Sequence, residues 1–109
     1  MSERKIALVT GAGSGIGRAV ALALMKDGWD LALAGRRVDA LEATAQAGKQ
    51  FGGRCLVQST DVSDPDSVDH LFERIGNEFG RLDLLFNNAG IFTKPASIED
   101  IPYEHWQAA

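Results

Sequence analysis

The chain alternates between short runs of apolar residues and longer segments in which apolar residues recur every three or four positions. The short runs predict strands at residues 4–10, 29–34, 54–59 and 82–86. Their centres are continuously apolar rather than alternating between apolar and polar residues. We therefore expect strands that are buried on both faces, as in a parallel sheet.

The longer segments predict helices at residues 16–27, 38–51 and 65–79, with a fourth helix beginning near residue 99 or 102. The first helix is expected to pack through the positions at helical spacing, which are Ile16, Ala19, Val20, Ala23 and Leu24. Asp64 and Pro65 have the residue types preferred at a helix start, and Gly28 and Gly80 follow predicted helix ends.

Strands and helices alternate strictly along the sequence. With right-handed crossovers this order predicts an α/β fold, in which a parallel sheet carries helices on both faces. No linker, repeat or low-complexity segment interrupts the pattern, so we expect residues 1–109 to form a single domain.

Composition narrows the classes of function. The 109 residues carry a formal net charge of −4 and contain no basic run, which argues against nucleic-acid binding. No apolar stretch is long enough to span a membrane or to serve as a signal peptide. The lone Cys55 lies within an apolar run, where it is expected to be a small core residue. These features predict a cytoplasmic protein.

A glycine-rich turn, from Gly11 to Gly17, joins the first predicted strand to the first predicted helix. A helix start offers unpaired backbone N–H groups and a partial positive charge, and glycines let a phosphate approach them. The turn departs from the G-x-G-x-x-G dinucleotide fingerprint because the third glycine position holds Ile16. It is not a P-loop, because no Gly-Lys-Ser/Thr is present. A methyltransferase loop is disfavoured, because its strand usually ends in an acidic residue before the glycines, and this sequence has Thr10 at that position.

Three motifs together resemble the short-chain dehydrogenase/reductase family. They are the spacing Thr10-Gly11-x-x-x-Gly15-Ile16-Gly17, the pair Asp61-Val62 and the tetrapeptide Asn87-Asn88-Ala89-Gly90. The resemblance covers essentially the whole chain and corresponds to the N-terminal, cofactor-binding half of a member. It implies a truncated, three-layer Rossmann-like domain with strand order 3-2-1-4 and no C-terminal half. The fourth strand would then be an exposed edge, and we expect self-association through it.

The resemblance also implies a role for each motif residue in binding a dinucleotide. Gly11 permits the tight turn, Gly15 and Ile16 offer N–H groups to the pyrophosphate, and Gly17 lets the helix approach the sheet. The hydroxyl of Ser14 is a further donor. Asp61 would accept the adenine amino group, with Val62 beside the ring. The ribose contact and the bracing of the central strands would come from Asn87, Ala89 and Gly90.

The end of the second predicted strand indicates which nicotinamide cofactor is used. An NAD enzyme has an acid about 20 residues past its glycines, to bind the ribose 2′-OH. Here the sequence reads Gly35-Arg36-Arg37, and Asp39 falls inside the next helix. A guanidinium matches a phosphate through paired, charge-assisted hydrogen bonds. We therefore expect NADP rather than NAD, with Arg36 as the first phosphate ligand and Arg37 as the second. Arg18 is expected to be a surface residue.

The catalytic residues of the family have no counterpart in this sequence. Family members use a Ser and a Tyr-x-x-x-Lys, whereas the lone tyrosine, Tyr103, is followed four residues later by Gln107. Neither His70 nor His105 has a partner at metal-ligand spacing, so no metal site is expected. We predict an NADP(H)-dependent oxidoreductase for carbonyl reduction or alcohol oxidation, represented by a cofactor-binding part that is inactive alone. The alternative is a stand-alone or truncated nucleotide-binding module without catalysis.

Overall fold

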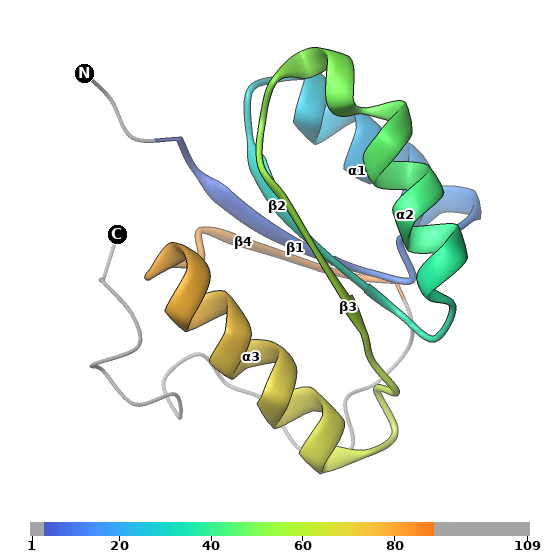
Figure 1. Ribbon diagram of the computed structural model, residues 1–109, viewed down its shortest axis with the longest axis vertical. Coiled ribbons are helices and arrows are strands. Elements are labelled where there is room, and N and C mark those ends of the chain that lie inside the picture. Colours follow the sequence, from blue (N-terminus) through green and yellow to red (C-terminus); the bar gives the residue numbers. More distant parts are fainter. Residues whose placement is uncertain (1–3, 89–109) are drawn as a thin grey trace.

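The computed structural model describes residues 4–88 (Figure 1). These residues form a four-stranded parallel sheet with order β3-β2-β1-β4. The strands are β1 (Ile6–Thr10), β2 (Asp30–Gly35), β3 (Cys55–Ser59) and β4 (Leu84–Asn87). The helices are α1 (Gly15–Lys26), α2 (Val38–Ala47), the short 3-10 helix η1 (Lys49–Phe51) and α3 (Pro65–Phe79). The predicted α/β fold and strand order are confirmed. The predicted fourth helix, Tyr103 and His105 lie outside the described residues.

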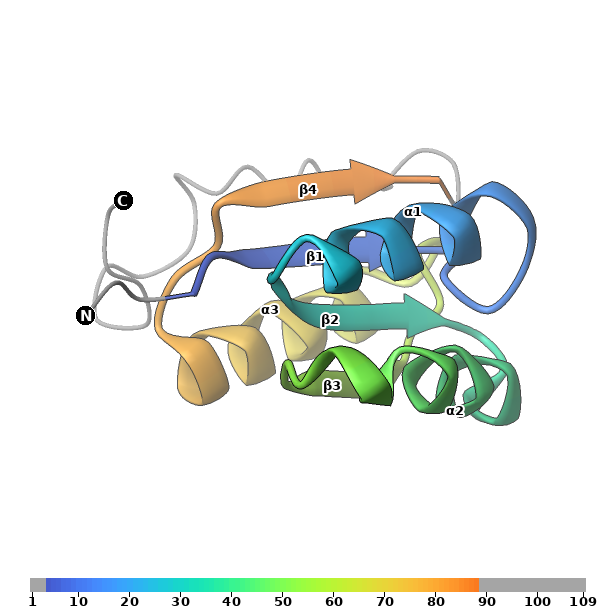
Figure 2. The ribbon, with the colours of Figure 1, turned by 90° about the horizontal axis from the view of Figure 1, so that it is seen from above.

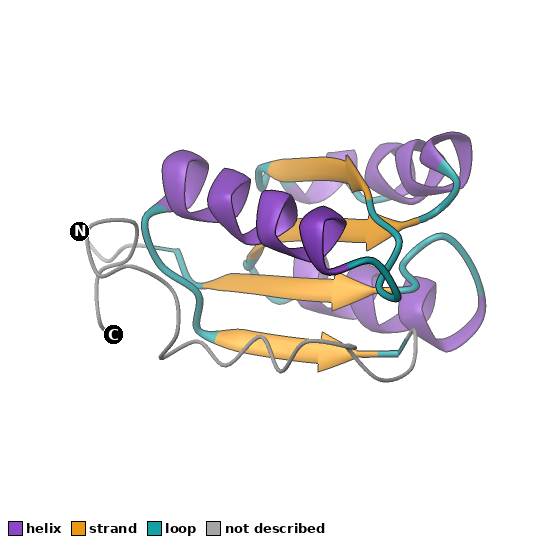
Figure 3. Ribbon diagram, turned by 90° about the horizontal axis from the view of Figure 1, so that it is seen from below, coloured by secondary structure: helices purple, strands orange, loops and turns teal. Residues whose placement is uncertain are grey.

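The helices form a layer on each side of the sheet. Figure 2 shows α1 and α2 on one face, and Figure 3, from the opposite side, shows α3 across the other. All four strands run in the same direction, so their carboxyl ends meet at one edge. The turns after β1, β2 and β3, which carry the predicted binding residues, are therefore neighbours in space.

The core consists of two apolar clusters separated by the sheet. Consecutive residues of β1 point to opposite faces, so Leu8 packs toward α3 while Val9 packs toward α1 and α2. Both side chains are fully buried. This double burial explains why the sequence of the central strands is continuously apolar. Cys55, on the edge strand β3, is half-buried at the margin of the second cluster, and burial raises the pKa of its thiol to about 11.

Helix α3 matches its sequence prediction closely. The Asp64 side chain accepts a hydrogen bond from the backbone N–H of Asp66 at 3.0 Å, and Pro65 is the first helical residue. The helix ends at Gly80, whose φ of 75° is in the left-handed region that favours glycine. Its apolar stripe is buried against the sheet at Val68, Leu71, Phe72 and Ile75.

The packing face of α1 differs from the sequence prediction. The residues buried in this helix are Gly17, Ala21 and Met25, whereas Ala19 and Ala23 are exposed and Ile16 is 67% exposed. Val20 and Leu24 are partly buried, as expected from the pattern. The predicted stripe is shifted because Gly17 makes the closest approach. A hydrophobicity pattern does not register a residue that packs through its backbone.

Two carboxylates fix the opposite, amino-terminal edge of the sheet. Asp30 is buried and accepts hydrogen bonds from Arg4 Nε at 2.7 Å and from the backbone N–H of Arg54 at 2.9 Å. Asp83 accepts from the backbone N–H of Ile6 at 2.9 Å and from Arg81. Burial acts to raise the pKa of Asp83, but the bonds from Arg81 and Ile6 outweigh it and hold this pKa below its usual value.

Two negative findings apply to residues 4–88. No helix there is long and apolar enough to cross a membrane. The same residues contain no cluster of three or more side chains able to hold a metal ion. His70 is exposed on α3, where its Nδ1 lies 3.8 Å from a carboxylate oxygen of Glu73.

Candidate functional site: the glycine loop and its cavity

The glycine loop leaves β1 at Thr10 and enters α1 at Gly15. Gly11 and Gly15 have φ values of 63° and 58°, so the loop needs glycine at both positions. Ser14 caps the helix with an exposed side chain that makes no capping hydrogen bond, and the first turn contains no acidic residue. The N–H groups at the start of α1 therefore keep their positive potential for an anion.

Gly17 holds the helix against the loop. A Cβ atom at this position would lie 2.1 Å from the backbone oxygen of Gly11 and 3.0 Å from Asn88 Nδ2. The first distance is far inside van der Waals contact, so no side chain fits there. α1 therefore lies directly against the backbone of the glycine loop at Gly17.

Thr10 joins the glycine loop to the end of β4. Its side chain is fully buried and donates a hydrogen bond from Oγ1 to Asn87 Oδ1 at 2.9 Å. The same oxygen accepts from the backbone N–H of Asn88 at 2.9 Å. Asn87, a predicted ribose contact, is thereby held by β1. Ala89 and Gly90, predicted with it, lie outside the described residues.

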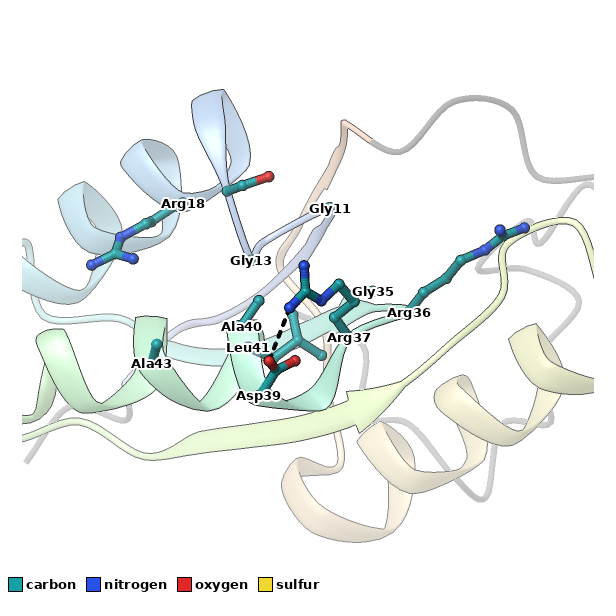
Figure 4. Close-up of a pocket in the computed structure, with 11 residues that line it drawn as sticks. Gly11, Gly13, Arg18, Gly35, Arg36, Arg37, Asp39, Ala40, Leu41 and Ala43 are labelled. Atoms are coloured by element: carbon teal, nitrogen blue, oxygen red, sulfur yellow. Dashed lines mark hydrogen bonds and ion pairs between the residues drawn. The ribbon is translucent and has the colours of Figure 1, made fainter.

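A cavity of about 450 Å³ opens beside the loop (Figure 4). Its walls are the glycine loop with Arg18, the turn after β2 and the start of α2. A Cβ atom at Gly13 would lie 2.8 Å from Ala40 Cβ, so the loop and the start of α2 are in close contact. The cavity is therefore bordered by two helix N-termini, and the α1 end, which has no acidic residue in its first turn, favours an anionic ligand.

Arg36 and Arg37 both line this cavity, and each is paired with a carboxylate. Arg37 Nη2 lies 3.0 Å from Asp39 Oδ2, and Arg36 Nη2 lies 3.2 Å from Asp61 Oδ1. In Figure 4 the Arg37 guanidinium reaches toward the glycine loop, whereas Arg36 extends away from it. The two guanidinium groups thus point in different directions, Arg37 toward the glycine loop and Arg36 toward Asp61.

Asp61 is the first residue of the turn after β3. Its Oδ1 accepts hydrogen bonds from Ser63 Oγ at 2.6 Å and from the backbone N–H of Ser63 at 2.9 Å. The Ser63 hydroxyl, followed by the Ser63 N–H and Arg36, lowers the pKa of Asp61, so this carboxylate is charged at neutral pH. Val62 beside it is partly exposed.

The structure brings together most of the predicted site. Gly11, Ser14, Arg36 and Arg37 line the cavity directly, and Arg36 connects it to Asp61. The backbone of Gly15, Ile16 and Gly17 forms the start of α1 above the loop.

Two charged residues that line the cavity, Arg18 and Asp39, are not among the site residues predicted from the sequence. Arg18 was expected on the surface and Asp39 was assigned only to the next helix, yet both line the cavity. The position of the two residues in the sequence could have identified them. Each lies in the first turn of a helix that starts at the carboxyl edge of the sheet.

Comparison with known proteins points to one family. The family model described as short chain dehydrogenase matches residues 5–109. A 3beta-hydroxysteroid dehydrogenase of Mediterraneibacter gnavus is 39% identical over 104 residues, which cover 95% of this chain and 38% of the relative. Dehydrogenase/reductase SDR family member 1 of Mus musculus is 46% identical over 86 residues, which cover 78% of this chain and 28% of the relative. The chain spans less than half the length of these relatives.

A solved structure agrees with the sequence comparison. The alcohol dehydrogenase of the archaeon Thermococcus sibiricus, complexed with 5-hydroxy-NADP, superposes with a TM-score of 0.73 at 40% identity. The superposition covers 76% of this chain and 36% of the archaeal chain. The motifs, the strand order and the family match over residues 5–109 agree. This chain therefore belongs to the short-chain dehydrogenase/reductase family and corresponds to its N-terminal part.

Proposed function

We propose that this chain is the dinucleotide-binding part of an NADP(H)-dependent oxidoreductase that interconverts a carbonyl compound and an alcohol. The observation that carries the proposal is the cavity at the carboxyl edge of the sheet, which joins the glycine loop to Arg36 and Arg37. When bound, the cofactor supplies or accepts a hydride. The residues of this chain bind and orient it.

The surroundings of the loop fit a pyrophosphate. The start of α1 has no acidic residue in its first turn, and Gly17 leaves no side chain between helix and loop. In the proposal, the N–H groups of Gly15 and Ile16 and the hydroxyl of Ser14 hold the diphosphate. Asp61, charged and partly exposed, accepts the adenine amino group beside Val62. The ribose contacts come from the segment formed by Asn87, Ala89 and Gly90.

The preference for NADP over NAD is proposed from the charges near the end of β2. Gly35, the last residue of β2, is followed by two arginines, and no acid occupies the position expected for a ribose 2′-OH ligand. The archaeal relative, whose structure contains 5-hydroxy-NADP, is consistent with this preference.

Replacing Arg36 by aspartate tests the phosphate-binding role. A hydrogen bond to a charged group contributes about 1.5–3 kcal/mol, so NADPH affinity should fall roughly 10- to 100-fold. NADH affinity should change much less, because NADH lacks the 2′-phosphate. Fluorescence titration of both cofactors measures the two values. Lys49→Asp, which makes the same charge change in η1 beyond the other end of α2, is the control. Unchanged NADPH affinity in Arg36→Asp would rule out this role.

We also propose that the chain alone binds cofactor without catalysing hydride transfer, because its sequence contains no Tyr-x-x-x-Lys. A stand-alone nucleotide-binding module is the second candidate, favoured by the same observation. NADPH oxidation by the 109-residue chain with a panel of ketones and aldehydes should stay at background. Sequencing the coding DNA past residue 109 separates the candidates, because only the oxidoreductase needs Tyr-x-x-x-Lys there.

Self-association through β4 is a further proposal. Within residues 4–88 this strand pairs only with β1, and Leu84 on it is 39% exposed. An unpaired strand edge can accept a strand from another chain, and lysine on an edge opposes this. Light scattering should show a dimer or larger species that Leu84→Lys dissociates. A monodisperse monomer of the unaltered chain would contradict the proposal.

The cytoplasmic location stays a prediction.

A further inference from the structure

We infer that Asp39 is a specificity-determining residue, whose carboxylate weakens the binding of a 2′-phosphate in the glycine-loop cavity. The inference rests on the proposed function, because it concerns the same cofactor site. It assigns to Asp39 a role opposite to that of the arginines beside it.

Asp39 lies in the wall of the cavity. It is the second residue of α2 and lines the same cavity as Gly11, Gly13 and Arg37. The near contact between Gly13 and Ala40 fixes this end of α2 against the glycine loop. A phosphate bound between the loop and the turn after β2 therefore approaches an acidic side chain as well as basic ones.

Asp39 forms an ion pair with Arg37. Asp39 Oδ2 lies 3.0 Å from Arg37 Nη2, and Figure 4 shows this contact as a dashed line. The hydrogen bond from Arg37 lowers the pKa of Asp39, so the carboxylate is charged at neutral pH. A 2′-phosphate has to compete with this carboxylate for the guanidinium and is repelled by its charge.

The contrast between the two helix starts supports the assignment. The first turn of α1 contains no acid, whereas the first turn of α2 contains Asp39. An acid at a helix N-terminus reduces the attraction of that helix end for an anion. The α1 end is therefore open to a phosphate, while the α2 end is already neutralised.

Asp39→Asn tests the inference, because asparagine keeps the side-chain shape and removes the charge. The probes are adenosine 2′,5′-bisphosphate and adenosine 5′-monophosphate, titrated calorimetrically into the full 109-residue chain. Arg37 and Asp39 are 77% and 73% exposed, so their interaction is screened by solvent. We expect the ratio of bisphosphate to monophosphate affinity to rise about three- to fivefold, and this gain to shrink at high salt.

Two further variants separate the pairing of Asp39 with Arg37 from a general change in charge. Glu42→Gln makes the same charge change on an exposed position of α2 that is not part of this cavity, and it should leave the ratio unchanged. In an Arg37→Gln background, Asp39→Asn should lose most of its gain, because no guanidinium is released.

The outcomes distinguish this inference from the proposed function. If the unaltered chain prefers the bisphosphate but Asp39→Asn leaves the ratio unchanged or lowers it, the inference fails and the proposed function stands. If the unaltered chain binds neither probe, or does not prefer the bisphosphate, the proposed function fails and the inference fails with it.

Discussion

Replacing Gly17 by alanine should abolish dinucleotide binding and lower the free energy of unfolding by about 3 kcal/mol. The new Cβ would lie 2.1 Å from the Gly11 backbone oxygen, so α1 or the glycine loop has to move. The Gly11 oxygen is a backbone atom, so no flexible side chain can move aside to relieve the contact. The loop that would shift is the proposed diphosphate site. Urea unfolding followed by circular dichroism gives the stability, and fluorescence titration with NADPH gives the binding.

Gly28→Ala is the matched control for this substitution. Gly28 follows α1 at its other end, has a φ of 96°, and has no atom within 4 Å of an added Cβ. It should therefore cost about 1 kcal/mol through backbone strain and leave NADPH binding intact. If Gly17→Ala behaves like Gly28→Ala in both measurements, the close approach of α1 to the loop is not what the site requires.

Removal of the Asp30 carboxylate should produce the second large effect. Asp30→Ala leaves the backbone N–H of Arg54 and the guanidinium of Arg4 without their acceptor at a position that is only 4% exposed. The Arg4 side chain is 41% exposed and can turn to solvent, whereas the Arg54 N–H loses its acceptor at a buried position. We therefore expect a loss of about 1–3 kcal/mol in the free energy of unfolding. Asp30 lies at the edge of the sheet opposite the glycine loop. NADPH affinity of the folded fraction should therefore be retained.

Two further variants serve as comparisons for Asp30→Ala. Asp30→Asn keeps an oxygen acceptor for the Arg54 N–H and should cost less than Asp30→Ala. Asp27→Ala removes an exposed carboxylate at the end of α1 and should change stability by less than about 0.5 kcal/mol. Equal stabilities for Asp30→Ala and Asp27→Ala would show that the buried hydrogen bonds do not hold the start of β2.

Most of the architecture could be predicted from the sequence because several local signals agree. The continuously apolar strands indicate a parallel sheet, and Asp64, Pro65 and Gly80 mark the ends of α3, as the structure confirms. The motif resemblance supplied the strand order, which apolar periodicity alone does not determine.

The sequence predicted less of α1 and of the cavity, for two physical reasons. Gly17 packs through its backbone, so the buried face of α1 was displaced from the predicted stripe. Asp39 and Arg18 are far apart along the chain, and contacts between the glycine loop and α2 bring their helices to one cavity. These contacts include the approach of Gly13 to Ala40 and the hydrogen bond from Thr44 Oγ1 to the Ala12 carbonyl at 2.9 Å. Such contacts depend on backbone positions that no residue pattern encodes.

The preference for NADPH over NADH is the central claim, and the direct test is the ratio of the two dissociation constants for the unaltered chain. Fluorescence titration at equal ionic strength should give NADPH the lower dissociation constant by at least about tenfold, the effect of one charge-assisted hydrogen bond. A dissociation constant for NADH equal to or below that for NADPH would contradict the account.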